Sequence, residues 1–208
     1  MAHEVRNPLA GIRSTVQLWE RLPDTARTQG SIQAIVQAVD RLNDIVSRLL
    51  YFSRSDRAER QPIQVNDLSE TLGLLEAQAS SQAVSLELER ERDLPEVLAS
   101  ASALQQVFLN LATNALPAMP HGGRLHCLTG SLPEGHRIEI RFADTGPGIS
   151  LEDRKHLFEP FFTTRPEGTG LGLALCREIV LQHGGQIELA DGRPGTTFRV
   201  TLPTRHEQ

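Results

Sequence analysis

The sequence predicts an α + α/β protein with two folded parts: an antiparallel helical hairpin at residues 1–56 and an α/β sandwich at residues 63–206. Three observations predict it. Two apolar seams at helical spacing come first, a polar stretch follows them, and short alternating apolar segments then recur between helical patterns. Residues 57–62 are the expected linker between the two parts.

The first fifty residues carry the two apolar seams. Their members are spaced 4, 3, 4, 3 in Val5, Leu9, Ile12, Val16 and Trp19, and 3, 4, 3, 4, 3 in Ile32, Ile35, Val39, Leu42, Val46 and Leu49. Two such seams joined by a short polar loop indicate an antiparallel helical hairpin. Because a hairpin of about 50 residues buries too little surface to be stable alone, we expect a second copy to complete a dimeric four-helix bundle. The alternative is a hairpin packed on its own second domain.

Beyond the seams, helical and alternating segments predict one sheet with helices on one face. The polar stretch Ser53–Pro62 (SRSDRAERQP) contains the linker. The predicted helices are one capped by Asn66 that runs through Leu75, one from about Ser102 to Leu116 opened by a capping box of Ser102 and Gln105, and one from near Gly170 to Gly184-Gly185. The predicted strands lie at residues 84–88, 125–128, 138–142, 186–190 and 197–202.

Composition excludes several classes of protein. Of the 208 residues 39% are hydrophobic and 23% are charged, which excludes a disordered tail. The formal net charge of −5 argues against a general nucleic-acid-binding or membrane-surface protein. With no apolar run near the roughly 20 residues of a membrane helix and no secretory signal, we expect a cytoplasmic chain without membrane contact. Cys127 and Cys176 lack metal-ligand and redox spacing and are expected to be buried apolar groups.

Two asparagines mark one face of the predicted helix around residue 110. Asn110 and Asn114 lie four residues apart in VFLNLATNAL and therefore share a helix face, while Val107, Phe108 and Leu111 supply the apolar side. Neutral carboxamide oxygens suit a Mg²⁺ that keeps several waters and leans on substrate phosphates. Two exposed or internally bonded asparagines are the alternative.

Two glycine-rich motifs follow predicted strands or precede a predicted helix. In DTGPGI, the carboxylate of Asp144 can accept a hydrogen bond from an exocyclic amine such as that of adenine, and Gly146 and Gly148 allow close backbone approach. A plain Asp-Gly turn is the alternative. In GTGLGL, residues 168–173, exposed N–H groups and a helix N-terminus favour phosphate oxygens.

About 20 residues separate these two motifs, and loops of that length are often functional lids. The segment contains LFEPFFTTR. Phe158, Phe161 and Phe162 are the expected apolar anchors of this lid, and Arg165 is placed to meet a phosphate.

Taken in order, NxxxN, DxGxG, the phenylalanine-rich lid and GxGxG opening a helix resemble a known nucleotide-binding domain. It is the GHKL (Bergerat) domain shared by histidine kinases, Hsp90-type chaperones, type II topoisomerases and MutL-like proteins, and the match covers roughly residues 63–206. The resemblance implies that Asp144 reads adenine and that Asn110 and Asn114 position Mg²⁺. It also implies an ATP site made by a larger set: Asn110, Asn114, Asp144, Gly146, Gly148, Phe162, Arg165, Gly168, Thr169, Gly170, Leu171, Gly172 and Thr197.

The N-terminal motif HEVRNPL resembles the H-box of sensor histidine kinases, closest to the nitrogen-regulation and zinc-responsive sensors. At about 100° per residue, His3 lies about 200° from Val5 and so points away from the seam. Glu4 is adjacent and can hold one ring proton, and Asn7 lies one turn further on the face of His3. Pro8 removes a backbone N–H, so we expect a bend at this turn.

These resemblances imply a protein-histidine kinase with the cofactors ATP and Mg²⁺. His3 would take the γ-phosphoryl group of ATP and pass it to an aspartate of a response-regulator receiver domain, in this flavour of H-box one belonging to a σ54-type activator. Asn7 would serve the reverse activity, regulator phosphatase. Only two residues precede His3, so we interpret the chain as the catalytic fragment of a longer sensor, cytoplasmic or anchored in the inner membrane.

Two other classes of function stay open. A GHKL ATPase or chaperone would use the same pocket to hydrolyse ATP, but it has no use for HEVRNP on a hairpin. A pseudokinase scaffold would bind nucleotide without transferring a phosphoryl group.

Overall fold

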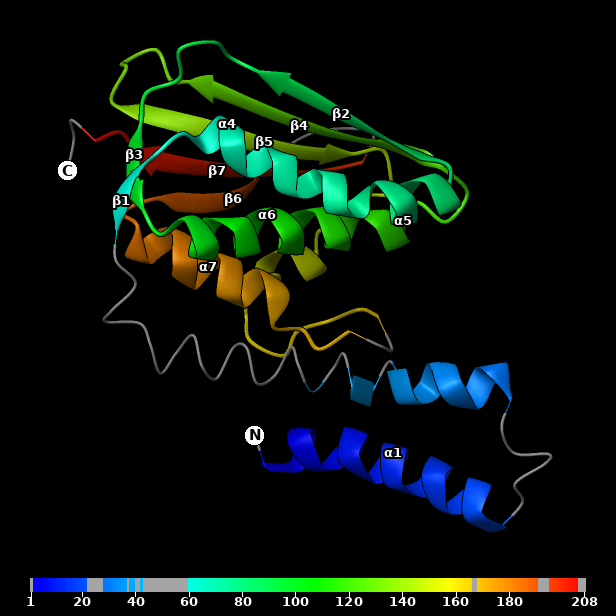
Figure 1. Ribbon diagram of the computed structural model, residues 1–208. Coiled ribbons are helices and arrows are strands. Elements are labelled where there is room, and N and C mark those ends of the chain that lie inside the picture. The colour runs from blue at the N-terminus through cyan, green and yellow to red at the C-terminus, as the bar shows by residue number, and fades with distance from the viewer. Residues whose placement is uncertain are drawn as a thin grey trace. The chain divides into compact units, whose positions relative to one another are not determined.

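The computed structural model of the chain describes residues 2–21, 28–36, 38–39, 42, 60–165, 168–190 and 195–205, with side chains from Pro8 onward. The chain divides into two compact units, residues 1–58 and residues 59–208, called here the helical unit and the α/β unit. Figure 1 shows both. Each is described by itself.

The helical unit begins with α1 (Ala2–Arg21), which continues through Pro8, and residues 29–36, 38–39 and 42 are again helical. The second helical run starts with a reciprocal cap: Ser31 N–H donates to Thr28 Oγ1 at 3.2 Å, and Thr28 N–H donates to Ser31 Oγ at 3.0 Å. The indole of Trp19 donates to the same Ser31 Oγ at 3.1 Å, which joins the end of α1 to the start of the second run. This is the hairpin that the seams predict.

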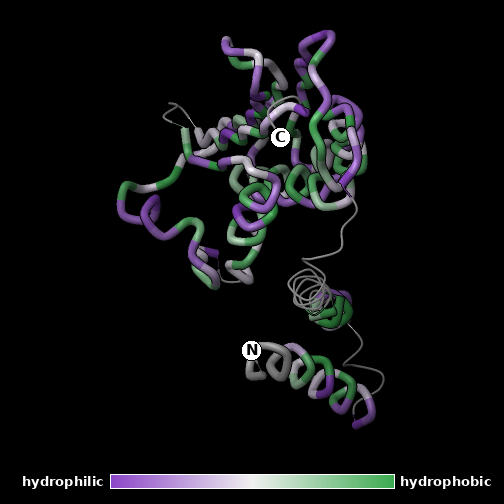
Figure 2. Tube along the Cα trace, turned by 90° about the vertical axis from the view of Figure 1, so that its left-hand side faces the viewer, coloured by the Kyte–Doolittle hydropathy of each residue, from purple (hydrophilic) through white to green (hydrophobic). Residues whose placement is uncertain are grey.

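Several seam residues of the helical unit remain exposed within one chain. Leu9 is 50% exposed, Ile32 49% and Val39 41%. Figure 2 shows the hydrophobic residues recurring along α1. Val46 and Leu49, which would extend the second seam, lie outside the described residues, as does the loop at 22–27.

The α/β unit is built on a five-stranded sheet. Its strands are β2 (Val84–Arg90), β4 (Gly123–Ser131), β5 (Arg137–Asp144), β6 (Gln186–Ala190) and β7 (Thr196–Pro203), in the order β2-β4-β5-β7-β6. Only the β2–β4 pair is parallel among these four pairs. Every strand predicted from alternation is therefore present, with ends that differ by a few residues.

Helices cover one face of this sheet (Figure 1), as predicted. They are α4 (Val65–Leu68), η1 (Ser69–Leu75), α5 (Glu76–Ser81), α6 (Ala101–Ala115) with η2 (Leu116–Ala118), and α7 (Gly172–Gln182). The core lies between the two layers, where the ring of Phe108 on α6 meets that of Phe142 on β5 edge-to-face at 5.2 Å. Leu104, Leu111 and Ile140 are each 1% exposed, so this core is closed.

The start of α6 and the role of Asn66 differ from the sequence prediction. Ser100, not Ser102, is the N-cap of α6, and its Oγ accepts from Ala103 N–H at 3.4 Å. Asn66 lies inside α4, where it donates to Glu91 O at 3.0 Å and accepts from Thr129 Oγ1 at 2.6 Å. Both serines and the asparagine are good caps by residue type, and tertiary contacts decide which of them caps.

The stop of α7 agrees with the prediction. Gly184 takes φ +68°, Gly184 N–H donates to Leu181 O at 3.0 Å, and Gly185 N–H donates to Val180 O at 2.9 Å. These are the two hydrogen bonds of a Schellman motif. This motif ends a helix with a residue in the left-handed backbone conformation, which glycine adopts without strain.

A second, two-stranded sheet was not predicted. β1 (Gln61–Ile63) pairs antiparallel with β3 (Val97–Ala99). Three-residue strands, one of them with a proline, carry no alternating pattern that a sequence can reveal. The range expected as a linker, 57–62, overlaps β1 at Gln61 and Pro62, which already belong to this sheet.

Candidate functional site

The central side chain of the candidate site is Asp144, the last residue of β5. It is buried, and its Oδ1 accepts from Gly146 N–H at 2.9 Å and from Thr196 N–H at 3.1 Å. Burial raises the pKa of this carboxyl, while these hydrogen bonds and the charge of Arg165 act in the opposite direction. Asp144 is therefore a fixed acceptor facing the helix layer, suited to a ligand N–H.

Glycines bring backbone close to Asp144. A Cβ on Gly146 would lie 3.1 Å from Ala118 O, and a Cβ on Gly195 would overlap the backbone of Asp144 at 1.7 Å from its carbonyl oxygen. Gly148 adopts φ +80°, a conformation that favours glycine. The strand end, the turn after it and η2 thus pack together without side chains between them.

Thr196, and not the predicted site residue Thr197, lies beside Asp144. Thr196 pairs with Asp144 across β5 and β7, while Thr197 pairs with Ala143. Since successive strand residues point to opposite faces, Thr197 lies on the open face of the sheet, away from Asp144. The structure does not bring Thr197 to the site, because a one-residue step in a strand reverses the face.

Asn110 and Asn114 project from one face of α6, as predicted. Asn110 Oδ1 accepts from Gln106 Nε2 at 3.1 Å, and its Nδ2 lies 3.5 Å from Gly172 O at the start of α7. Asn114 is half-buried, and its amide makes no hydrogen bond with any side chain or backbone group that the structure describes. Asn110 therefore lies beside the beginning of α7, and Asn114 lies one turn further along the same face of α6.

The glycine loop leads into the N-terminus of α7. Gly170 has φ +65°, and a Cβ there would lie 2.3 Å from the carbonyl carbon of Phe161, so only glycine fits against the lid. Phe161 N–H donates to Gly170 O at 2.9 Å. Among the described residues, no side chain makes a cap hydrogen bond at the N-terminus of α7, so the N–H groups of its first turn suit an anion. Gly168, Thr169 and Leu171 are half-buried here.

The lid residues are anchored by rings. Phe158 lies 6.3 Å from Phe198 of β7, measured between ring centroids, and Phe162 lies 5.5 Å from His156. Phe161, which was also expected as an anchor, is 49% exposed with φ +72°. Residues 166–167 lie outside the described part of the lid.

Arg165 ends the described part of the lid and reaches α6. Its Nη2 donates to the backbone oxygen of Asn114 at 2.5 Å. The sequence placed Arg165 near phosphate but carried no signal for this contact, which joins residues 51 positions apart.

His183 was also missed as a structural residue. It is 4% exposed; its Nδ1 lies 2.7 Å from Ile179 O and its Nε2 accepts from Ser100 N–H at 3.1 Å. The imidazole is therefore the neutral tautomer with hydrogen on Nδ1, and it ties the end of α7 to the start of α6. Arg60, next to β1, donates to Gln182 O at the same corner.

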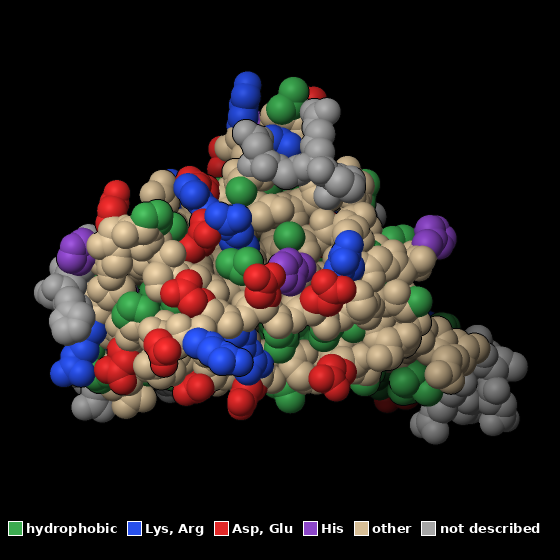
Figure 3. Space-filling view, turned by 90° about the horizontal axis from the view of Figure 1, so that it is seen from above, with side chains coloured by type: hydrophobic (Ala, Val, Ile, Leu, Met, Phe, Trp, Pro, Cys, Tyr) green, Lys and Arg blue, Asp and Glu red, His purple; other side chains and the backbone are tan. Residues whose placement is uncertain are grey.

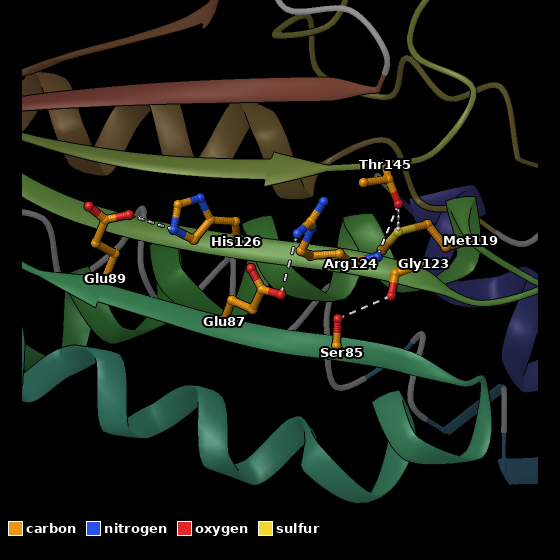
Figure 4. A network of polar contacts seen from close by, with 8 residues as sticks. All are labelled: Ser85, Glu87, Glu89, Met119, Gly123, Arg124, His126 and Thr145. Carbon is orange, nitrogen blue, oxygen red and sulfur yellow. Dashed lines mark hydrogen bonds and ion pairs between the residues drawn. The ribbon is translucent and has the colours of Figure 1, made fainter.

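The face of the sheet opposite the helices is polar and lies apart from Asp144. Figure 3 shows acidic and basic side chains side by side on it. Figure 4 shows His126 paired with Glu89 at 3.1 Å and Arg124 with Glu87 at 3.6 Å, across the β2–β4 pair. These charged side chains pair with one another across the two strands.

His3, Glu4 and Asn7 lie in the first two turns of α1, and their side chains are outside the described residues. Pro8 follows them within the helix and leaves the Glu4 carbonyl without its usual N–H donor. The helical backbone therefore places His3 and Asn7 on one face of α1.

Comparison with known proteins assigns both units. Residues 1–58 match the model of the His Kinase A (phospho-acceptor) domain, and residues 99–206 match that of the histidine kinase-, DNA gyrase B-, and HSP90-like ATPase. The chain belongs to the sensor histidine kinase family. The predicted order of a helical phosphoacceptor part and a GHKL sandwich is confirmed.

Relatives in this family are similar over nearly the whole chain. Sensor histidine kinase ZraS of Escherichia coli (strain K12) is 36% identical over 98% of this chain and 44% of its own length. Sporulation kinase D of Bacillus subtilis (strain 168) is 35% identical over 97% of this chain and 40% of its own length. The chain spans less than half the length of these curated relatives.

Solved structures of histidine kinases share the fold. Histidine kinase ThkA, in complex with response regulator protein TrrA, aligns with a TM-score of 0.81 at 27% identity, over all of this chain and 60% of that one. The isolated catalytic domain of ThkA aligns with a TM-score of 0.65 at 29% identity, over 70% of this chain and 96% of that one. Among the helices that the structure describes, none has the length and apolar character to span a lipid bilayer.

Proposed function

We propose that this chain is the kinase portion of a cytoplasmic signalling protein, and that it transfers the γ-phosphoryl group of ATP to His3. The observation that carries the proposal is the site of the α/β unit. A buried acceptor at Asp144 lies at one end of it, and the open N-terminus of α7 lies at the other. That pairing suits a ligand with an amine on a flat ring and a chain of phosphates.

The residues between these two ends fit a magnesium nucleotide. Asn110 lies beside the start of α7 and Asn114 one turn further along α6, where the amide of Asn114 has no partner among the described groups and can offer a neutral oxygen. Among the described side chains, no three His, Cys, Asp or Glu residues gather as a metal site, so Mg²⁺ would lean on the carboxamides and the phosphates. When bound, the ion would neutralise charge on the phosphates.

The transfer step needs a nucleophile, a base and a leaving group. An imidazole nitrogen of His3 attacks the γ-phosphorus, the bond to the bridging oxygen of ADP breaks, and the ring proton passes to the carboxylate of Glu4. An imidazole with a pKa of about 6.5 is mostly neutral in the cytosol, so a light base suffices. In-line placement then supplies most of the acceleration.

The exposed seams support a homodimer. The seam residues Leu9, Ile32 and Val39 are 41–50% exposed in one chain, and a second copy would bury them in a four-helix bundle. By similarity to ThkA, whose complex holds a response regulator, we propose a receiver domain as the phosphoryl acceptor. Asn7 would serve the reverse hydrolysis, and the H-box favours a σ54-type activator as the regulator.

Incubation with γ-labelled ATP and Mg²⁺ tests the proposal. The kinase gives label on protein that is acid-labile and base-stable, and His3→Gln abolishes it, while His126→Gln on the open sheet face retains it. Release of free phosphate without labelled protein would indicate an ATPase, and nucleotide binding with neither product a scaffold. Label that persists in His3→Gln would overturn the assignment of His3.

A further inference from the structure

The guanidinium of Arg165 caps the end of α6. Its Nη2 donates to the backbone oxygen of Asn114, one of the last carbonyls of a helix that ends at Ala115. Such carbonyls lack an intrahelical donor, and a cation there also meets the negative end of the helix dipole. The backbone of Arg165 is held as well, since its N–H donates to Thr163 Oγ1 at 3.1 Å and its carbonyl accepts from Gly168 N–H at 3.0 Å.

This position lies on the Asp144 side of the site. Asn114 comes one helical turn before Ala118, and Ala118 O is 3.1 Å from where a Cβ of Gly146 would stand. Gly146 in turn donates to Asp144. Burial raises the pKa of Asp144, and the positive charge of Arg165 offsets part of that rise.

The phosphate end of the site lies the other way along α6. Asn110, not Asn114, is the residue that reaches Gly172 at the start of α7. Arg165 is therefore about one turn of α6 away from the expected phosphate cradle. In this structure the guanidinium is held at the Asp144 end of α6, which is the end where we expect a ring to bind.

We propose that Arg165 is a specificity-determining residue that competes with the ring of an incoming ligand and is released by its phosphates. The inference rests on the proposed function and deepens it. A nucleoside without phosphates must displace the guanidinium and gives it no new partner. A nucleoside triphosphate gives it one, because guanidinium binds phosphate in bidentate geometry. Arg165 thus favours phosphorylated ligands in two ways. It opposes the binding of a ring at the Asp144 end of the site, and it binds the phosphates of a ligand that carries them.

The test compares adenosine with Mg·ATP as two probes of the 208-residue chain. Arg165→Met keeps the apolar stem and removes both the donor and the charge. Arg165→Lys keeps the charge and loses the planar fork. Arg154→Met is the matched control, because Arg154 also lies in the lid, is half-buried and donates to a backbone carbonyl, that of Ile149, at 3.2 Å. Dissociation constants come from titration calorimetry, with Mg·ATP displacement for weak adenosine binding.

The expected result is a change of opposite sign for the two probes. Arg165→Met binds adenosine about tenfold more tightly and Mg·ATP about tenfold more weakly, since hydrogen bonds to charged groups shift equilibria by about this factor or more. Arg165→Lys falls between the wild type and Arg165→Met for both probes. Arg154→Met stays within about twofold of the wild type.

Two results would overturn the inference, and they differ. If Arg165→Met weakens Mg·ATP but leaves adenosine unchanged or weaker, Arg165 is only a phosphate ligand, and the proposed function stands. If the wild type binds neither probe while its melting transition shows a folded α/β unit, the inference and the proposed nucleotide function fail together.

Discussion

The two units differ in how they close their cores. In the α/β unit, Leu104 and Leu111 of α6 are each 1% exposed, between two layers supplied by the same chain. In the helical unit, Leu9, Ile32 and Val39 are 41–50% exposed although they lie on the predicted seams. The same residue types thus form a finished core in one unit and half of one in the other.

The α/β unit and the helical unit are therefore expected to differ in how much their stability depends on a partner. Burial of apolar surface is the main source of stability, so the α/β unit is expected to fold without help, whereas the helical unit gains most of its stability from association. Each unit carries its own probe for measuring stability. Trp19, the single tryptophan, belongs to the helical unit, and both cysteines belong to the α/β unit.

The largest effect is expected from Asp144→Asn, a substitution that tests whether the ligand binds in the α/β unit. The amide can still accept from Gly146 and Thr196 but loses the charge, so affinity for Mg·ATP falls about a hundredfold. Because burial raises the pKa of the Asp144 carboxyl, its ionised form is disfavoured in the fold, and melting of the α/β unit is not lowered. Asp67→Asn, at an exposed position on α4, retains affinity.

The next largest effect is expected from shortening one apolar side chain in each unit. Leu111→Ala leaves a cavity in the closed core and lowers the free energy of unfolding of the α/β unit by about 3 kcal/mol. Ile32→Ala leaves that unit unchanged and weakens the helical unit instead. Thermal unfolding at several protein concentrations, followed by Trp19 fluorescence and by circular dichroism, separates the two. A Trp19 unfolding transition whose midpoint does not change with protein concentration would contradict stabilisation of the helical unit by association.

A smaller effect concerns acid. Burial lowers the pKa of His183 below its ordinary 6.5, so the folded state binds fewer protons than the unfolded state. Stability of the α/β unit is therefore full above about pH 6.5 and is lost as the pH falls through and below that value. Urea unfolding at about pH 7.5 and about pH 5.5 shows this loss in the wild type and a weaker one in His183→Gln. Equal losses in both would contradict the neutral tautomer.

The smallest effect is expected for alkylation of the two cysteines, which should not react in the folded wild type. Burial raises the pKa of the Cys127 thiol to about 12, and Cys176 is fully buried against α6, where its Sγ lies 4.0 Å from Val107 O. Iodoacetamide attacks thiolates, so neither cysteine is alkylated while the α/β unit is folded. Leu111→Ala speeds alkylation and Ile32→Ala does not, as read by mass spectrometry. Rapid labelling of the wild type would mean that this unit opens more readily than its core implies.

Much of the site is predictable because it depends on local chemistry. Asp144 ends a strand and precedes glycines, and Asn110 and Asn114 share a helix face, so their residue types and spacing fix their places. The stop at Gly184-Gly185 is equally local. Each of these features needs only the chain within about one turn of itself.

What the sequence does not predict depends on contacts between distant segments. The bond from Arg165 to Asn114 spans 51 positions, and that from Ser100 to His183 spans 83. Thr196 and Thr197 are identical in type, and only the register between β5 and β7 decides which of them faces Asp144. Such choices belong to the packed fold, not to any local pattern.

The corner where Arg60, Gln182 and His183 meet has a mechanical consequence for the kinase. The chain joins the α/β unit there, at the last turn of α7, whereas the glycine loop opens the first turn. The eleven residues of α7 span about 16 Å. A pivot of about 20° at that attachment carries the phosphate-binding end through an arc of about 6 Å, while Ser100 beside the pivot barely moves. Because the chain enters the α/β unit far from the glycine loop, a rotation about the point of entry displaces the phosphate-binding end much more than the residues beside that point.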